Sequence, residues 1–446
     1  MCMVIMNSPS YAVFWFRRDL RLEDNTGLFQ ALKSGLPVLP VFIFDKNILD
    51  KLENPEDKRL RFIHSILCSL QDKLVAKGSG FRTFYGSPEE AFRILISEGN
   101  LKAVYANHDY EPYAKERDES ISNLLSSAGI SFFTFKDQVI FEKQEVLSAQ
   151  GNPYTVFTPY ANRWRSLLKE DDYHVRDSAS LGGNFLSWSS SGIIPLEDMG
   201  FVPAVEDFPP TTIGEDLLRA YAEKRDFPGL PATSRIGVHL RFGTISIRHC
   251  VRIGLQLSAT WLNELIWREF YMQILWNFPQ VGEGKSFKPA YDRIPWRNDP
   301  DEFARWCEGK TGYAIVDAGM RELNSTGFMH NRVRMIAASF LVKHLLIDWR
   351  WGEAYFASKL LDFDFSANNG GWQWAASSGC DAAPYFRVFN PLLQTQKFDK
   401  NLDYIKKWVP EYNSMSYIQY AVVEHSFARE RVLKVFKEAL GGVVPN

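Results

Sequence analysis

Cysteine is scarce in this sequence, and its pattern argues against two common kinds of structure. The chain has 446 residues but only five cysteines, and none of them belongs to a CxxC pair. Scattered cysteines in odd number suggest neither a disulfide framework nor a zinc site. We therefore expect no metal site, and we expect the cysteines to be small buried hydrophobic residues. They are Cys2, Cys68, Cys250, Cys307 and Cys380.

Long apolar runs are also missing. No segment reaches the roughly 20 apolar residues that a bilayer-spanning helix needs, and the opening residues MCMVIMNSPS lack the basic start and apolar stretch of a secretory signal. We therefore expect a cytoplasmic protein without a membrane segment. The formal net charge is only -2, so the chain is not basic overall, although a duplex-binding protein needs only a local positive patch.

The first 140 residues contain five short β-rich runs. These lie at 11–16, 38–44, 81–86, 103–107 and 131–135. They alternate with segments of helical periodicity, which predicts an α/β domain with a parallel, Rossmann-like sheet covered by helices on both faces. Such sheets bind ligands at the carboxyl ends of their strands. No GxGxxG follows the first run, where the sequence reads RRDLRLEDN, so an ordinary dinucleotide-binding domain is disfavoured.

The remainder of the chain changes character twice. Residues 141–214 lose periodicity, and the stretch 181–214 is dense in Gly, Ser and Pro. This predicts a connector that wraps across the domain surfaces. Residues 215–446 return to helical spacing in segments such as LLRAYAEK and HNRVRMIAASFLVKHLL, which predicts an all-α domain. The chain has 13 Trp, mainly in its second half, and we expect the chemistry there.

The segment 349–390 is the most informative part of the sequence. It mixes Trp with paired Asn and paired Gly, and Asp362 and Asp364 add polar groups that need partners once buried. Gly370 and Gly371 lack side chains where a flat ligand or another backbone could approach closely. The simplest interpretation is a cofactor pocket lined with electron-rich rings. A Trp-rich junction between helices is the alternative.

Two further patterns indicate binding. Glu264, Trp267 and Tyr271 have the spacing of one side of a helix, which suggests a functional carboxylate within an aromatic stripe or, alternatively, a solvated surface carboxylate. Thr233 and Ser234 stand before a predicted helix start, where hydroxyl and backbone N–H groups suit an anion such as a pyrophosphate. An ordinary Ser/Thr helix cap is the alternative there.

Four separated motifs resemble the photolyase and cryptochrome family and occur in the family's order. They are FWFRRDLRLEDN at 14–25, LNELIWREFY at 262–271, and the segments 311–340 and 349–390. The resemblance covers nearly the whole chain and is strongest to class I cyclobutane pyrimidine dimer photolyases. It implies an antenna domain at 1–140, a connector at 141–214, and an FAD-binding and DNA-binding helical domain at 215–446.

The implied activity is light-driven repair of pyrimidine dimers in UV-damaged DNA, with little sequence preference. Reduced FAD would donate an electron to the flipped-out dimer, and the protein would act as a monomer. A cryptochrome-type photoreceptor without repair activity is the alternative, although the chain ends without the long tail of many signalling cryptochromes. A DNA-independent flavin electron-transfer protein and an aromatic nucleic-acid-binding module are further candidates.

The resemblance assigns FAD contacts to residues from several segments. They are Tyr221, Thr233, Ser234, Arg235, Ile236, Gly237, Trp261, Arg334, Asp362, Phe363, Asp364 and Asn368. Arg334 and Asp362, on separate predicted helices, would form an ion pair beside the flavin ring, because either buried charge alone is costly. Asn368 would accept a hydrogen bond from flavin N5–H without adding charge, which favours an anionic hydroquinone as the working state. Plant cryptochromes carry Asp at that position, so Asn368 favours repair.

A second set of residues would contact the lesion and the DNA backbone. They are Arg225, Glu264, Trp267, Tyr271, Asn331, Arg332, Met335, Trp374 and Gln394. The resemblance makes Glu264 a hydrogen-bond partner of the damaged base, and Trp267 and Trp374 an aromatic wedge against the flipped dimer. Relatives that repair the (6-4) photoproduct typically carry His at the position of Asn331, so Asn331 favours cyclobutane dimers.

Two light-related assignments complete the resemblance. Trp372, Trp349 and Trp296 match the family's tryptophan chain, which reduces oxidised flavin from the surface inward. Tyr113 and Ala114 stand where folate-binding relatives carry an Asn-Glu pair, so a second antenna chromophore would be of the deazaflavin type rather than a folate. Loss of the second chromophore is the alternative.

Overall fold

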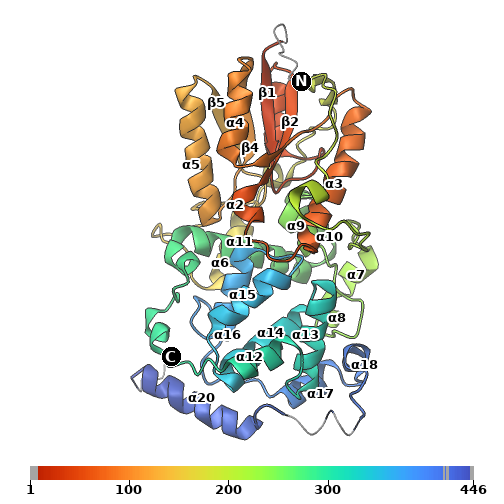
Figure 1. The fold of residues 1–446 in the computed structure, drawn as a ribbon. Coiled ribbons are helices and arrows are strands. Elements are labelled where there is room, and N and C mark those ends of the chain that lie inside the picture. The colour runs from red at the N-terminus through yellow and green to blue at the C-terminus, as the bar shows by residue number, and fades with distance from the viewer. Residues whose placement is uncertain (1–8, 415–416, 418–420, 442–446) are drawn as a thin grey trace. The chain divides into compact units, whose positions relative to one another are not determined.

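The computed structural model describes residues 9–414, 417 and 421–441, and it divides into two compact units (Figure 1). The first unit consists of Met1–Glu142, Leu168–Thr212 and Arg235–Gln256. The second consists of Lys143–Leu167, Ile213–Ser234 and Leu257–Asn446. Residues 141–214, which the sequence suggests as a connector, therefore contribute to both units.

A five-stranded parallel sheet forms the centre of the first unit (Figure 1). Its strands are β1 (Tyr11–Phe16), β2 (Val38–Asp45), β3 (Arg82–Gly86), β4 (Leu101–Asn107) and β5 (Ser131–Phe135). They lie in the order β3-β2-β1-β4-β5, and all four neighbouring pairs are parallel. The predicted Rossmann-like sheet is confirmed, and each β-rich run of the sequence lies within one residue or two of an observed strand.

Helices cover both faces of this sheet. They are α1 (Thr26–Lys33), α2 (Lys46–Leu49), α3 (Lys58–Val75), α4 (Pro88–Ser97) and α5 (Pro112–Ser127). Side chains alternate along β1, so Trp15 packs against Phe92 of α4 with ring centroids 5.1 Å apart, whereas Phe14 faces α1. A Cβ on Gly27 of α1 would lie 2.9 Å from the Phe14 ring, so glycine permits this close packing.

Buried ion pairs connect the carboxyl ends of the strands. Arg21, which follows β1, lies 2.5 Å from Asp137, which follows β5. Arg248 of α10 (Ile247–Leu257) binds both Asp137 and Asp24, each at 2.8 Å. Burial alone would raise the pKa of Asp137, but Arg21 and Arg248 outweigh burial and hold this pKa below its ordinary range. Side chains of the protein itself therefore fill part of the edge where parallel sheets usually bind ligands.

Helices make up the regular structure of the second unit in the part of the chain that the structure describes. They are α6 (Phe157–Leu167), α7 (Glu215–Arg219), α8 (Tyr221–Lys224), α11 (Ala259–Asn277), α12 (Pro300–Cys307), α13 (Ala314–Thr326), α14 (Asn331–Ser339), α15 (Trp349–Lys359), α16 (Phe365–Ala375), α17 (Pro391–Phe398), α18 (Asp403–Trp408) and α20 (His425–Ala439). Across residues 9–414, 417 and 421–441, no helix has both the length and the apolar character needed to span a membrane.

Three local details differ from the sequence interpretation. The segment 217–224 does not form one helix, because Ala220 separates α7 from α8. The helix predicted across 330–346 changes from α14 to a π-helix at Phe340–Leu345 and ends at Leu346, whose φ is 53°. Asp362 lies in the turn between α15 and α16 rather than on a helix, because Asp364 caps α16 and the helix begins only at Phe365.

Cysteine burial also departs from the expectation. Cys250 is buried, Cys307 and Cys380 are half-buried, and Cys68 is exposed, while Cys2 lies outside the described residues. Cys68 follows Leu67 on α3, whose buried stripe runs through Leu67, Leu70 and Leu74, so the cysteine falls on the outer face of the helix. The prediction of uniform burial was therefore wrong.

Candidate functional site

A cavity of about 450 Å³ lies among helices α11, α14, α15 and α16 of the second unit. Its volume is in the range of cofactor and small-molecule sites. Tryptophan rings, arginines and carboxylates share its surface. The lining residues are Arg225, Glu264, Trp267, Arg268, Tyr271, Asn331, Arg332, Arg334, Met335, Ala338, Phe356, Leu360, Asp362, Asp364, Ala367, Asn368, Gly371, Trp372 and Trp374.

Most of the residues singled out in the sequence line this one cavity. Those present are Arg225, Glu264, Trp267, Tyr271, Asn331, Arg332, Arg334, Met335, Asp362, Asp364, Asn368, Trp372 and Trp374. Those absent from the lining are Tyr221, Thr233, Ser234, Arg235, Ile236, Gly237, Trp261, Trp296, Trp349, Phe363 and Gln394. The cavity thus brings together residues assigned to the cofactor and residues assigned to the lesion, and each individual role stays a prediction.

An ion pair holds one side of the cavity. A terminal nitrogen of Arg334 lies 3.1 and 3.0 Å from the two carboxylate oxygens of Asp362. The Arg334 Nε donates to the carbonyl oxygen of Met329 at 2.7 Å, which fixes the plane of the guanidinium. Both side chains are partly buried, so each charge needs the other.

Asn368 is held by a residue that the sequence did not single out. The Asn368 Nδ2 donates to the Glu353 carboxylate at 3.0 Å and to the Glu353 carbonyl oxygen at 3.1 Å. Burial raises the pKa of Glu353, and the hydrogen bond from Asn368 opposes that shift. Since the amide donor is engaged by Glu353, the Asn368 carbonyl oxygen is the group that this side chain offers to a ligand.

Close packing seats Trp372 at the cavity wall. Its indole is 2% exposed, and a Cβ on Gly352 of α15 would lie only 2.1 Å from the ring. Gly352 is three residues beyond Trp349, which is 1% exposed, so α15 carries both the glycine and the second predicted relay residue. Trp296, the third predicted relay residue, is half-buried, and its ring centroid lies 5.9 Å from that of Phe436.

The two adjacent glycines of α16 serve different contacts. A Cβ on Gly370 would lie 2.1 Å from the Tyr271 ring, so Gly370 allows α16 to approach α11. A Cβ on Gly371 would have no atom within 4 Å, although Gly371 lines the cavity. A side chain at Gly371 would therefore project into open cavity space.

Aromatic and charged groups mark the part of the cavity nearest α11. Ser258 caps this helix, and Glu264, Trp267 and Tyr271 all reach the cavity from one side of it, as predicted. The Trp267 ring stacks on Phe157 at 3.7 Å with an interplanar angle of 5°. Burial raises the pKa of Glu264, although the ion pair with Arg225 at 2.5 Å acts in the opposite direction.

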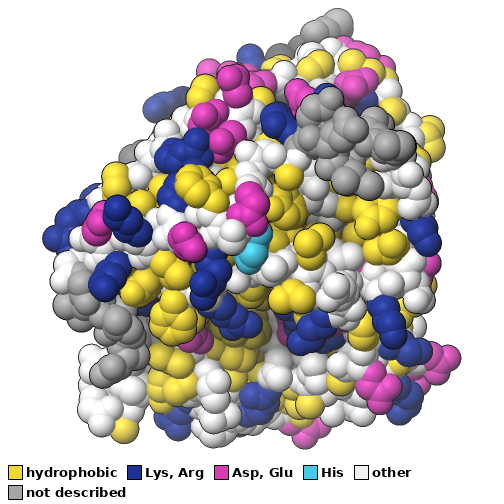
Figure 2. Space-filling model, turned by 90° about the horizontal axis from the view of Figure 1, so that it is seen from below, with side chains coloured by type: hydrophobic (Ala, Val, Ile, Leu, Met, Phe, Trp, Pro, Cys, Tyr) yellow, Lys and Arg dark blue, Asp and Glu magenta, His cyan; other side chains and the backbone are white. Residues whose placement is uncertain are grey.

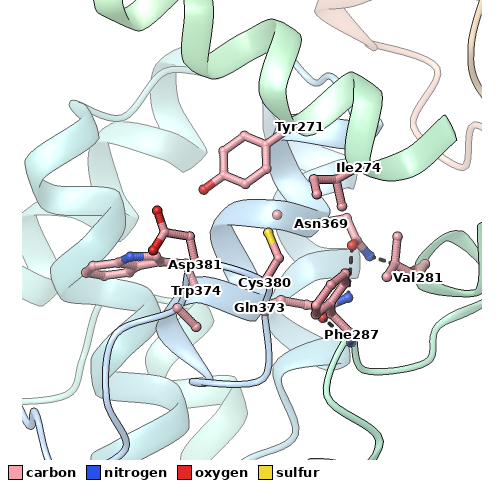
Figure 3. Close-up of a pocket in the computed structure, with 12 residues that line it drawn as sticks. Tyr271, Ile274, Val281, Phe287, Asn369, Gln373, Trp374, Cys380 and Asp381 are labelled. Atoms are coloured by element: carbon pink, nitrogen blue, oxygen red, sulfur yellow. Dashed lines mark hydrogen bonds between the residues drawn. The ribbon is translucent and has the colours of Figure 1, made fainter. Parts of the chain in front are cut away.

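A second, much smaller cavity adjoins the large one and shares Tyr271 and Trp374 with it (Figure 3). Its volume is about 20 Å³, which holds about one water molecule. Hydrogen bonds from Asn369 to Val281 and from Gln373 to Asn369 brace its wall. This cavity is too small for a cofactor.

The segment expected to bind an anion lies elsewhere. The Ser234 hydroxyl accepts a hydrogen bond from the Trp261 indole at 3.2 Å. The following helix, α9 (Gly237–Phe242), has Ile236 as its N-cap and no side-chain cap, so the alternative of a Ser/Thr cap is not observed. Binding of a phosphate by this segment stays a prediction.

The surface charge is mixed. On the face shown in Figure 2, lysine and arginine side chains are interspersed with acidic and hydrophobic ones and do not merge into one basic patch. This distribution agrees with the net charge of -2. On this face, therefore, no continuous basic patch would attract an anionic polymer.

Comparisons with known proteins match two parts of the chain. Residues 261–438 match the family described as the FAD binding domain of DNA photolyase, and residues 12–176 match the family described as DNA photolyase. The deoxyribodipyrimidine photo-lyase of Vibrio cholerae is 38% identical, over 96% of this chain and 99% of its own length. A bacterial class III photolyase from Agrobacterium tumefaciens is 34% identical with a TM-score of 0.85, covering 98% of this chain and 99% of its own.

A cryptochrome has a similar fold but a more distant sequence. The cryptochrome of Synechocystis sp. PCC6803 has a TM-score of 0.81 and 24% identity, over 96% of this chain and 99% of its own. Fold and matched families together define an FAD-binding protein with an α/β domain and a helical domain. Within that class, the identity and coverage of the relatives decide the assignment, and the chain belongs to the DNA photolyase family.

Proposed function

We propose that this protein is a deoxyribodipyrimidine photo-lyase that repairs cyclobutane pyrimidine dimers in UV-damaged DNA under light. One observation carries the proposal: the residues expected at the flavin, Arg334 and Asn368, line the same cavity as the residues expected at the lesion, Glu264 and Trp267. An electron donor and its acceptor could therefore lie in adjacent parts of one site. The photo-lyases named above support the same activity.

The residues of the cavity suit the isoalloxazine ring of FAD. The open space beside Gly371 accepts a flat ring, and the Arg334–Asp362 pair supplies a charge-balanced polar edge. The Asn368 carbonyl oxygen can accept a hydrogen bond from the N5–H of a reduced ring without adding negative charge, which favours the reduced, anionic form. When bound in that form, FAD would supply the electron that splits the dimer.

The lesion-side residues would bind and orient the damaged bases. Glu264 can accept a hydrogen bond from a base edge, while Trp267 and Trp374 can stack on the exposed rings. Base-flipping enzymes, photolyases among them, extrude a damaged base at a cost of a few kcal/mol, less than for an intact pair. Selection for damage would thus arise from the DNA itself, and Arg225 and Arg332 would hold phosphates without reading sequence.

A cryptochrome-type photoreceptor is the second candidate, and the Synechocystis protein establishes similarity of fold alone. Asn368 favours repair, because a carboxylate at that position would disfavour an anionic reduced ring. Glu264, Trp267 and Asn331 at the cavity would also lack a role in a sensor that does not bind lesions.

Two finer assignments accompany the proposal. Trp372, Trp349 and Trp296 would return electrons to oxidised flavin. Trp372 and Trp349 are buried, whereas Trp296 is half-buried, as expected of the outer end of such a chain. A second chromophore would be of the deazaflavin type. Tyr113 and Ala114 argue against a folate, because they supply neither the amide nor the carboxylate of the folate-binding pair. Extraction of the purified protein and chromatography of the released chromophores tests the second assignment.

A light-dependent repair assay tests the proposed activity. The purified protein is mixed with a thymine oligonucleotide carrying dimers and kept in blue light or in darkness. We expect thymine absorbance to recover only in the light. Recovery in neither condition, with flavin bound, would favour a photoreceptor, and a folded protein that takes up no flavin would contradict both candidates.

A further inference from the structure

Two ion pairs tie one short segment of the second unit across the cavity. Arg225 and Asp226 follow α8 directly, and each pairs with a different helix. Arg225 lies 2.5 Å from Glu264 of α11, and Asp226 lies 2.7 Å from Arg332 of α14. The segment therefore presents one cation and one anion, and each is neutralised by a residue of the cavity lining.

Arg332 is held in an incomplete set of contacts. Its guanidinium lies over the Phe398 ring at 4.4 Å, and one terminal nitrogen reaches the Met335 sulfur at 3.8 Å. Among the described residues, its Nε is buried and has no hydrogen-bond partner. A buried donor without an acceptor is costly, so this arginine has unused capacity for an acceptor such as a phosphate or base oxygen.

The ion pairs limit what the cavity offers to DNA. Arg225 and Arg332 both line the cavity, yet in the free protein each faces a carboxylate. A phosphate that approaches either arginine must displace that carboxylate and meets its repulsion.

We propose that Asp226 determines specificity by neutralising Arg332 and so suppressing the binding of undamaged DNA. This inference rests on the proposed function and deepens it. Glu264 likewise neutralises Arg225, but Glu264 would also accept a hydrogen bond from a base of the lesion. When a flipped base engages Glu264, Arg225 is released for a phosphate, so phosphate binding is coupled to occupancy of the cavity. Asp226 lacks that second role, and its carboxylate only weakens binding.

The test compares binding to a duplex with one thymine dimer and to the same duplex without it. Asp226→Asn keeps the size of the side chain but removes its charge. Glu223→Gln is the matched control, because Glu223 is an exposed carboxylate three residues earlier and its removal changes the net charge equally. Both variants are first checked for flavin absorbance and thermal stability, and affinities are measured in darkness at several salt concentrations.

We expect Asp226→Asn to bind undamaged duplex about three- to tenfold more tightly, as follows from freeing one partly exposed arginine. Affinity for the damaged duplex should change less, so discrimination falls, and the salt dependence on undamaged DNA should steepen by about one ion. Glu223→Gln should leave discrimination unchanged.

Unchanged or weaker binding of undamaged duplex by a folded Asp226→Asn protein would overturn the inference, and so would an equal effect of Glu223→Gln. If the unmodified protein fails to prefer damaged DNA, the proposed function itself is wrong, which is a distinct result.

Discussion

The Asn368 Nδ2 donates to both the side-chain carboxylate and the carbonyl oxygen of Glu353, at 3.0 and 3.1 Å. These contacts orient the amide, so its oxygen faces away from Glu353 and is free to act as an acceptor. The electronic environment at the flavin would therefore depend on a residue that is not among those lining the cavity.

Glu353→Ala should weaken the hold of the protein on fully reduced flavin. Without the acceptor, the Asn368 amide can rotate and present N–H instead of oxygen toward N5–H. We expect several-fold faster reoxidation in air, followed by flavin absorbance. Glu353→Gln keeps an acceptor oxygen and should resemble the unmodified protein, and identical rates in all three proteins would refute this role.

Asp362→Asn should lower the flavin content of the purified protein. The substitution leaves the partly buried Arg334 without its counter-charge, and flavin binding should weaken by about 1–3 kcal/mol. The measurement is the ratio of flavin to protein absorbance after purification. Glu302→Gln is the control, since Glu302 pairs with Arg297 away from the cavity lining; equal loss of flavin in both would show a general effect of ion pairs.

Gly371→Ala and Gly370→Ala should separate cofactor binding from folding. The added methyl at Gly371 meets open space, so the melting temperature should hold while flavin content falls. At Gly370 the methyl would overlap the Tyr271 ring, and the melting temperature should drop. Calorimetry measures the melting temperature and absorbance measures the flavin content of the same samples. Full flavin content in Gly371→Ala would show that the flavin ring does not lie beside Gly371.

Trp372→Phe should block photoreduction of oxidised flavin while leaving repair by chemically reduced protein intact. Phe keeps an aromatic ring against Gly352 but is much harder to oxidise than Trp. The rate of flavin bleaching under blue light with an added thiol is the readout. Trp188→Phe, a tryptophan of the first unit, should bleach at the unmodified rate, and an undiminished rate in Trp372→Phe would exclude this residue from the relay.

Lys343 should make stability depend on pH. The side chain is 1% exposed on the π-helix, its Nζ donates to the Ser377 hydroxyl at 2.7 Å, and burial lowers its pKa to about 7. Between pH 7 and the ordinary lysine value of about 10.4, the unfolded chain binds the proton and the folded chain does not. Stability due to this group therefore rises with pH across that range and is lowest below pH 7.

Lys343→Met removes this titration while keeping a long apolar side chain. The stability of this variant minus that of the unmodified protein should be largest near pH 6 and should fall steadily toward pH 10. Denaturant titrations at each pH measure the difference. A difference that does not vary with pH would mean that Lys343 stays charged in the folded protein.

The sequence was sufficient for the architecture because its signals are local. Runs such as YAVFWF and VLPVFIF are continuous and apolar, as buried parallel strands require, and they coincide with β1 and β2. Helical spacing likewise placed Glu264, Trp267 and Tyr271 on one side of α11. The motif resemblance then identified most of the cavity lining.

Contacts between distant segments, in contrast, could not be predicted from local patterns in the sequence. Glu353 and Asp226 look like ordinary exposed acids in the sequence, and only their pairing with Asn368 and Arg332 distinguishes them. The π-helix at Phe340–Leu345 has a composition that fits an α-helix equally well. The helix α6 was also missed, because Pro159 stands within its first turn and its buried stripe is short, consisting of Tyr160, Ala161 and Trp164.

A crystal structure of the protein with a duplex that carries one thymine dimer tests the central claim most directly. We expect FAD between the Arg334–Asp362 pair and Asn368, and the extruded dimer in the same cavity against Glu264, Trp267 and Trp374. A flavin bound outside this cavity, or a dimer that remains stacked in the duplex, would contradict the account.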